Sequence, residues 1–315
     1  MMIKTKNTNF SSLLEKLYQK LLSNRTKEKS EHVILWIALV SFTVHLLIIG
    51  LIHYQIIPSN DIPSLLKNPI AAVYTPFSFI LVYEVYLLIY YLPKSTSTYI
   101  SKQYEIIALV IIRRLFKDLS DLSLTSNWFY DKYDLQFTYD LVASVILFYL
   151  IYLFNVQSAR VYRSYDKDKS KSSNILKFIN AKKWIATALV PVLLTIAIYS
   201  FLTWSISIFL PNETHAISFK NINNIFFEQF FSLLIIADVI LLLFSFFHTD
   251  EFHKVIRNSG FIISTILIRI SFSVSGILNN VLIISAVLFG LSLLFIHNKF
   301  EKKIAEATQD KVESE

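Results

Sequence analysis

The chain has 315 residues, of which 54% are hydrophobic and only 17% are charged, whereas a soluble globular domain contains roughly 25% charged residues. It has no cysteine, which excludes disulfides and cysteine-ligated metal sites, and its 4 glycines form no phosphate-binding loop. The net charge of +7 argues for basic loops beside anionic lipid, and we expect no binding of nucleic acid.

The first 32 residues are polar and contain no apolar core of the length that a cleavable signal peptide needs. Within this segment, apolar residues recur at helical spacing from Phe10 to Leu22, with Glu15, Lys16 and Lys20 between them. This pattern predicts a short amphipathic helix, which either lies on the inner membrane face or packs against the helix bundle.

Eight hydrophobic segments follow, and they predict an all-α, polytopic integral membrane protein with eight transmembrane helices. The third and seventh segments contain charges and short apolar runs, so either one alone resembles a re-entrant or interfacial element. We count both as spans because each is flanked by clearer ones and because the positive-inside rule is then satisfied. The segments are 33–57, 70–92, 103–119, 137–156, 184–210, 226–247, 255–273 and 277–297.

Most of the 30 lysines and arginines fall in the segments that a cytoplasmic N-terminus places inside. This bias predicts that both termini are cytoplasmic, because basic residues accumulate in cytoplasmic loops. Without the third and seventh spans, the basic segment 157–183 would face outward, against the rule. The predicted cytoplasmic segments are 1–32, 93–102, 157–183, 248–257 and 298–315.

The Lys/Ser-rich segment 157–183 is the predicted domain boundary and separates two four-helix repeats. Trp36-Ile37-Ala38 resembles Trp184-Ile185-Ala186, and further matches follow in the same order, which favours an internal duplication. Four spans in each half give the copies the same orientation, so they would form two pseudo-symmetric bundles. The predicted parts are a cytoplasmic amphipathic segment 1–32, a first repeat 33–156, a basic cytoplasmic linker 157–183, a second repeat 184–298 and a polar tail 299–315.

The strongest feature of this duplication is a repeated acid and base. The stretches FSFILVYEVYLL and FSLLIIADVILL place Glu84 and Asp238 in register, and the next apolar segments contain Arg113 and Arg269. Counted from the predicted span ends at about 1.5 Å per residue, each carboxylate lies at nearly the same depth as the arginine of its own half. We therefore expect two intramembrane pairs, Glu84–Arg113 and Asp238–Arg269.

These predicted pairs have two interpretations. An isolated charge at the bilayer centre costs roughly 2.5–3.5 kcal/mol, and bidentate pairing relieves much of this cost. In the structural interpretation, each pair fixes the register of two helices. In the functional one, the four charges line an ion or proton path or sense voltage. Water access distinguishes the two, because a path must be solvated from at least one side.

Other polar residues are weaker candidates. His45, in the middle of the first span, either relays protons along a possible path or hydrogen-bonds a neighbouring helix. The sequence HTDEFH contains His248, Asp250 and His253, which are possible ligands of a divalent metal. Two histidines five residues apart do not share a helical face, so we expect a solvated turn there, with no metal and no cofactor.

The charged stretches resemble the bacterial phosphate-starvation-inducible protein E (PsiE) family of small four-helix membrane proteins. The resemblance implies two PsiE-like units and a bacterial inner-membrane location. The chain differs from the family in being tandem and in having basic extensions. The matching positions are Tyr83-Glu84-Val85 with Ile112-Arg113, and Ala237-Asp238-Val239 with Ile268-Arg269-Ile270.

Two functions follow from these observations. The first is a transport or channel-like protein in which the buried charges line a polar path. The alternative is a non-catalytic, stress-related membrane protein whose charge pairs are structural and whose linker 157–183 binds a protein partner or anionic lipid. We do not expect an enzyme, because the chain contains no GxSxG, no HExxH and no nucleophile with a suitably spaced base.

Overall fold

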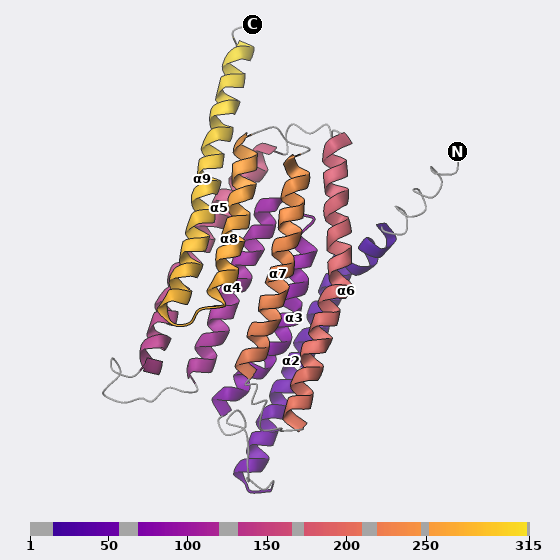
Figure 1. Ribbon diagram of the computed structural model, residues 1–315, viewed down its shortest axis with the longest axis vertical. Helices are drawn as coiled ribbons and strands as arrows, with labels where there is room; N and C mark the ends of the chain where they lie inside the picture. Colours follow the sequence, from indigo (N-terminus) through magenta and orange to yellow (C-terminus); the bar gives the residue numbers. More distant parts are fainter. Residues whose placement is uncertain are drawn as a thin grey trace, which may run out of the picture. The chain divides into compact units, whose positions relative to one another are not determined.

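The computed structural model describes residues 15–56, 69–119, 132–165, 173–209, 219–246 and 252–313, and within these ranges every regular element is a helix (Figure 1). Residues 15–21 are also helical. Within the described ranges, eight longer helices follow the eight predicted segments in order, and the short 3₁₀ helix η2 precedes the second of them. They are α2 (Asn24–His53), η2 (Pro69–Val73), α3 (Tyr74–Tyr91), α4 (Thr96–Leu119), α5 (Lys132–Tyr165), α6 (Ser173–Phe209), α7 (Phe219–Phe246), α8 (Phe252–Ser271) and α9 (Ile277–Glu313).

Several helices begin earlier than the apolar runs predict, because polar caps extend them. Ser23 is the N-cap of α2, and its hydroxyl accepts the backbone N–H of Thr26 at 3.1 Å. Ser95 plays the same part before α4, where its hydroxyl accepts the N–H of Thr98 at 3.2 Å. Capping residues satisfy donors that a helix start leaves open, so these helices continue past their hydrophobic segments.

The predicted linker 157–183 is mostly helical. α5 continues through residue 165 and α6 starts at residue 173, so only 166–172 lie outside the described part. Lys182 is buried and donates to the backbone oxygen of Lys94 at 3.1 Å. Lys183 forms an ion pair with Glu15 at 2.9 Å. Two of the basic groups of this segment are thus engaged within the protein.

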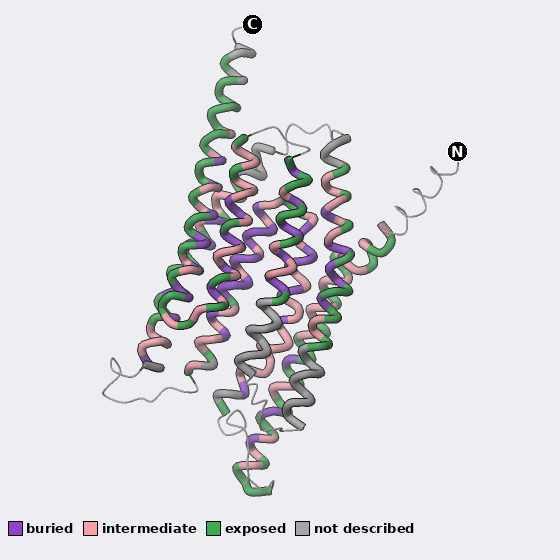
Figure 2. Tube along the Cα trace, viewed as in Figure 1, coloured by how far each residue is buried: buried purple, intermediate pink, exposed green. Residues whose placement is uncertain are grey.

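Five helical stretches of the described chain are long and apolar enough to cross a membrane. They and the shorter apolar helix Thr75–Tyr91 are compatible with a multi-pass membrane protein, and the eight-span arrangement stays a prediction. Many large apolar side chains are exposed, among them Leu47, Val145 and Leu243. Figure 2 shows exposed and buried residues alternating along α9. Exposed apolar surface of this extent suggests a membrane-embedded protein. The five stretches are Glu15–His53, Asp134–Ala159, Lys177–Tyr199, Gln229–Phe246 and Ile277–Ala307.

The chain forms two compact units, and each unit takes segments from both halves of the sequence. The predicted repeat boundaries, 33–156 and 184–298, therefore stay a prediction. The first unit comprises Met1–Tyr91, Leu109–Val142 and Lys183–Phe230, and the second comprises Leu92–Ala108, Ala143–Lys182 and Phe231–Glu315.

In the first unit, α2 packs on α3, and one face of α3 contacts the start of α2 and the residues just before it. The hydroxyls of Tyr83, Tyr86 and Tyr90, spaced three and four residues apart, donate to Glu31 at 2.8 Å, to the backbone oxygen of Leu21 at 2.9 Å and to the side chain of Asn24, respectively. Residues at this spacing share a helical face. Of the two predictions for the N-terminal helix, the structure favours packing against other helices.

In the second unit, α8 and α9 lie side by side at very short range (Figure 1). A Cβ atom added at Gly260 would lie 1.7 Å from Cδ1 of Leu293, and one added at Gly290 would lie 1.9 Å from the Tyr104 hydroxyl oxygen. These glycines permit a close approach that any larger residue would prevent. The tight packing aligns polar groups of α4, α8 and α9, including the 2.8 Å hydrogen bond between Tyr104 and Ser264.

Candidate functional site

The first predicted charge pair is formed within the first unit. Arg113 on α4 donates from Nη2 to Oε2 of Glu84 on α3 at 2.7 Å, and each side chain is only 4% exposed. Both residues sit on otherwise apolar helical stretches, so their charges are compensated by each other. A short, charge-assisted bond in a dry environment is strong, and breaking it leaves a buried charge.

The second predicted carboxylate has a different environment. Asp238 on α7 is buried, and its Oδ2 accepts from the Tyr99 hydroxyl at 3.5 Å and from Nε2 of Gln103 at 3.4 Å. Both donors lie on α4, and both are neutral. Within the described part of the chain, no cationic side chain is hydrogen-bonded to Asp238. Its two partners make long bonds, so the carboxylate is only weakly satisfied.

Gln103 connects this carboxylate to a third helix. Its amide nitrogen faces Asp238, and its oxygen Oε1 accepts from the Thr265 hydroxyl on α8 at 2.8 Å. Gln103 and Thr265 are both fully buried. The two contacts fix the orientation of the amide, because one end must donate and the other must accept. Asp238, Gln103 and Thr265 thus form a continuous hydrogen-bonded row across α7, α4 and α8, which we call the polar row.

A buried lysine lies in the electrostatic field of the same carboxylate. The ammonium group of Lys182 acts on Asp238 through space, while it donates to the Lys94 backbone oxygen at 3.1 Å and lies 3.5 Å from the Thr96 hydroxyl. A positive charge inside an apolar region is costly, and these contacts compensate it only in part. Lys182 thus influences Asp238 only through space, without a hydrogen bond to it.

The pair predicted between Asp238 and Arg269 does not form. Arg269 on α8 donates from Nε to the hydroxyl of Ser232 at 2.8 Å. Ser232 precedes Asp238 by six residues on α7, which separates them by about 9 Å along the axis. α8 begins at Phe252, five residues before the Arg257 from which the prediction counts. Arg269 therefore lies deeper than the count assumes.

His45 makes a contact between helices. Its Nδ1 is hydrogen-bonded to the Thr75 hydroxyl on α3 at 2.5 Å, and the ring is buried. Of the two roles considered for it, bonding to a neighbouring helix is the one that the geometry shows.

A further ion pair, between a partly exposed arginine and a buried aspartate, escapes the sequence analysis. Arg114 donates from Nε and Nη2 to the two carboxylate oxygens of Asp140 on α5, and Gln136 donates to the same carboxylate at 2.6 Å. Asp140 is fully buried. Both charges lie near the predicted outer ends of their spans. This shared depth could have predicted the pair from the sequence.

No protein-family model, no curated protein and no solved structure matches this chain. The resemblance to the PsiE family stays a prediction.

Among the metal candidates, His248 and Asp250 lie outside the described residues, whereas His253 lies beside His297 and Glu301.

Three of the carboxylates buried in the helices thus fall into two chemical kinds. Glu84 with Arg113, and Asp140 with Arg114, are direct ion pairs that join helices. Asp238 is a carboxylate held by neutral donors, with a lysine acting at a distance. A carboxylate of the second kind can bind a proton or a small cation without first losing a guanidinium partner.

Proposed function

We propose that this chain is a multi-pass membrane protein with a transport or channel-like function, in which Asp238 binds the transported proton or small cation. The observation that carries the proposal is the setting of Asp238, buried on α7 with neutral hydrogen-bond partners. Intramembrane carboxylates are expensive and recur at ion and proton sites of transporters.

The polar row supplies the rest of the proposed site. Hydroxyl and amide groups of Tyr99, Gln103 and Thr265 can each donate and accept, so they can accompany a proton or coordinate a dehydrated cation.

The site is closed in this conformation, since Asp238, Gln103 and Thr265 are all buried. Transport therefore requires a second conformation that opens the polar row to one side of the membrane. Alternating access to a buried site is the usual arrangement in transporters. The seal against solvent in the closed state is consistent with such a cycle and would be unsuitable for a permanently open pore.

The experiment is ion flux in proteoliposomes, with wild type compared with Asp238→Asn at matched incorporation. Asp310→Asn, a change at an exposed position on α9, is the matched control. We expect flux of protons or of one alkali cation in wild type and control, and loss in Asp238→Asn. Absence of flux in wild type for protons, Na⁺ and K⁺ would overturn the transport function. Equal flux in all three proteins would overturn the role of Asp238.

A second candidate function is a non-catalytic, stress-related membrane protein of the inner membrane of a bacterium, with cytoplasmic termini and PsiE-like units. The Glu84–Arg113 pair favours it, because the pair is short and closed to solvent as a structural bond should be. Under this function, basic residues of the 157–183 segment, among them the exposed Lys177, bind a partner or anionic lipid. Pull-down and liposome-flotation assays with charge-reversed linker variants test it, and unchanged binding would contradict it.

A further inference from the structure

The start of α8 and the later part of α9 bring together a group of side chains that the polar row does not use. His253 Nε2 lies 3.0 Å from Oε1 of Glu301, and His297 Nε2 lies 3.8 Å from the same oxygen. The two imidazole rings are stacked, with their centroids 5.1 Å apart. We call His253, His297 and Glu301 the His–His–Glu cluster.

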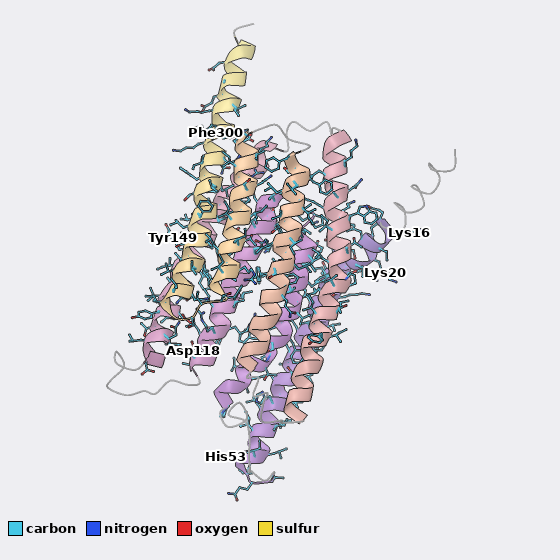
Figure 3. The ribbon with its side chains drawn as sticks, in the orientation of Figure 1. Lys16, Lys20, His53, Asp118, Tyr149 and Phe300 are labelled. Carbon is cyan, nitrogen blue, oxygen red and sulfur yellow. The ribbon has the colours of Figure 1, made fainter. Side chains whose placement is uncertain are left out.

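The sequence places these three residues together for simple reasons. His297 and Glu301 are four residues apart on α9, so they share one helical face. His253 is the second residue of α8, which packs along α9. Phe300, labelled on α9 in Figure 3, stacks on the His253 ring with centroids 6.1 Å apart and holds its orientation.

The separations fit a single metal ion. One ligand atom from each residue lies within 4.8 Å of the others. Bonds of about 2.1 Å in a tetrahedral zinc site place neighbouring ligand atoms about 3.4 Å apart. The two separations from Oε1 of Glu301, 3.0 Å to His253 and 3.8 Å to His297, lie on either side of this value. Two imidazoles and one carboxylate are a ligand set that zinc and related divalent metals accept.

His297 offers Nε2 to the cluster from a buried position. His297 is only 2% exposed, and its Nδ1 has no hydrogen-bond partner among the described residues. Nδ1 lies on another edge of the ring than Nε2, so it is not the atom offered to the metal, and the case for a site rests on the arrangement of the three ligand atoms.

Two cations compete with a metal at the cluster. Arg257 donates from Nη1 to Nε2 of His297 at 2.8 Å, and the Lys254 ammonium lies 3.9 Å from Oε1 of Glu301. Arg257 also donates from Nε and Nη2 to Oδ1 of Asn258, at 3.3 and 3.1 Å. The guanidinium therefore keeps a partner when it moves off His297. A metal ion and Arg257 would use the same imidazole nitrogen in turn.

We propose that the His–His–Glu cluster binds a divalent transition-metal ion of the zinc class, which links α8 to α9 and competes with Arg257 for His297. Three protein ligands leave a fourth position for water or for an anion. The site is separate from the proposed transport site, and its test does not depend on flux.

The experiment uses the full-length protein in detergent, purified without a polyhistidine tag and stripped of metal by chelation. Co²⁺ is titrated while its visible absorption is recorded, and Zn²⁺ affinity is measured by competition. We expect one Co²⁺ per chain with a tetrahedral spectrum. The His253→Gln and Glu301→Gln changes should each weaken binding at least about tenfold, since each removes one of three ligands. Arg257→Gln should strengthen binding, because it removes the competing cation.

His53→Gln, a change in an exposed histidine at the end of α2, is the matched control and should bind as wild type does. His297→Gln alters a buried residue and can fail to fold; the Glu301 side chain is 36% exposed, so Glu301→Gln keeps the test decisive. Absence of stoichiometric binding would overturn the proposal. So would unchanged affinity in both His253→Gln and Glu301→Gln, or binding lost only when His248 is replaced.

Discussion

The two acidic stretches that align in the sequence end in different environments. Glu84 forms an ion pair with Arg113 at 2.7 Å. Asp238 instead accepts hydrogen bonds from Tyr99 at 3.5 Å and from Gln103 at 3.4 Å. Two carboxylates at corresponding places in two similar stretches thus form an ion pair in one case and long hydrogen bonds to neutral groups in the other. Similar sequence does not guarantee similar electrostatics, because the partner comes from another helix whose register is set by packing.

This difference separates stability from function. A carboxylate with a guanidinium partner contributes to holding helices in register, and its loss exposes an opposite buried charge. A carboxylate with weak neutral partners stabilises little, so its retention needs another explanation. The following predictions test the comparison in order of expected effect on stability.

The largest effect is expected for Arg113→Leu, which leaves Glu84 buried without its cation. Breaking one side of a buried pair costs about 3–5 kcal/mol. Replacing both partners, with Glu84→Gln and Arg113→Leu together, should cost less than Arg113→Leu alone. Unfolding of wild type and of both variants by denaturant titration in detergent measures these losses. Equal stability of the single and double variants would contradict the pairing.

Gln103→Leu should come second. It removes the donor to Asp238 and the acceptor of the Thr265 hydroxyl, and both groups then remain buried. An unsatisfied buried polar group costs about 1–3 kcal/mol. The same denaturant titration measures it, with Gln136→Leu on α5 as a comparison from the Arg114–Asp140 pair. If Gln103→Leu lowered the free energy of unfolding no more than a substitution at an exposed position does, the polar row would not be formed.

The sequence predicts the helices well and the partners poorly. All eight apolar segments correspond to helices, because apolar runs of this length are strong signals. The depth count also brings Glu84 to Arg113. It fails for Arg269, since α8 starts earlier than the charge pattern implies, and the position of a helix start depends on capping and packing.

Two other features could not be predicted from local sequence patterns. Gln103 and Asp238 are 135 residues apart, and only the packing of α4 with α7 in the second unit joins them. The HTDEFH sequence directs attention to local histidine spacing, whereas His253 finds its neighbours on α9. The i, i+4 spacing of His297 and Glu301 is visible in the sequence. That His253 joins them from another helix is not.

Ser232→Ala should have a smaller effect. The Ser232 hydroxyl accepts from Nε of Arg269 at 2.8 Å, at a partly exposed position. A hydrogen bond of this kind contributes about 1 kcal/mol net. If the Arg269 contact were instead an ion pair comparable to Glu84–Arg113, the loss in denaturant titration would approach that of Arg113→Leu. A loss near 1 kcal/mol would confirm that the two arginines have different roles.

The smallest effect on stability is expected for Asp238→Asn, although it removes the proposed ion-binding group. Asparagine has the same shape and still accepts from Tyr99 and Gln103, while the cost of burying a carboxylate disappears. We expect a change of less than about 1 kcal/mol, in either direction, because neutral polar substitutes can replace weakly satisfied charges. The matched change Glu84→Gln leaves Arg113 without its carboxylate and should be clearly more destabilising. Denaturant titration of both variants, with flux measured on the same preparations, separates the two roles. A carboxylate whose removal abolishes flux and spares stability is kept for function, whereas a large loss of stability in Asp238→Asn would make it a structural residue like Glu84.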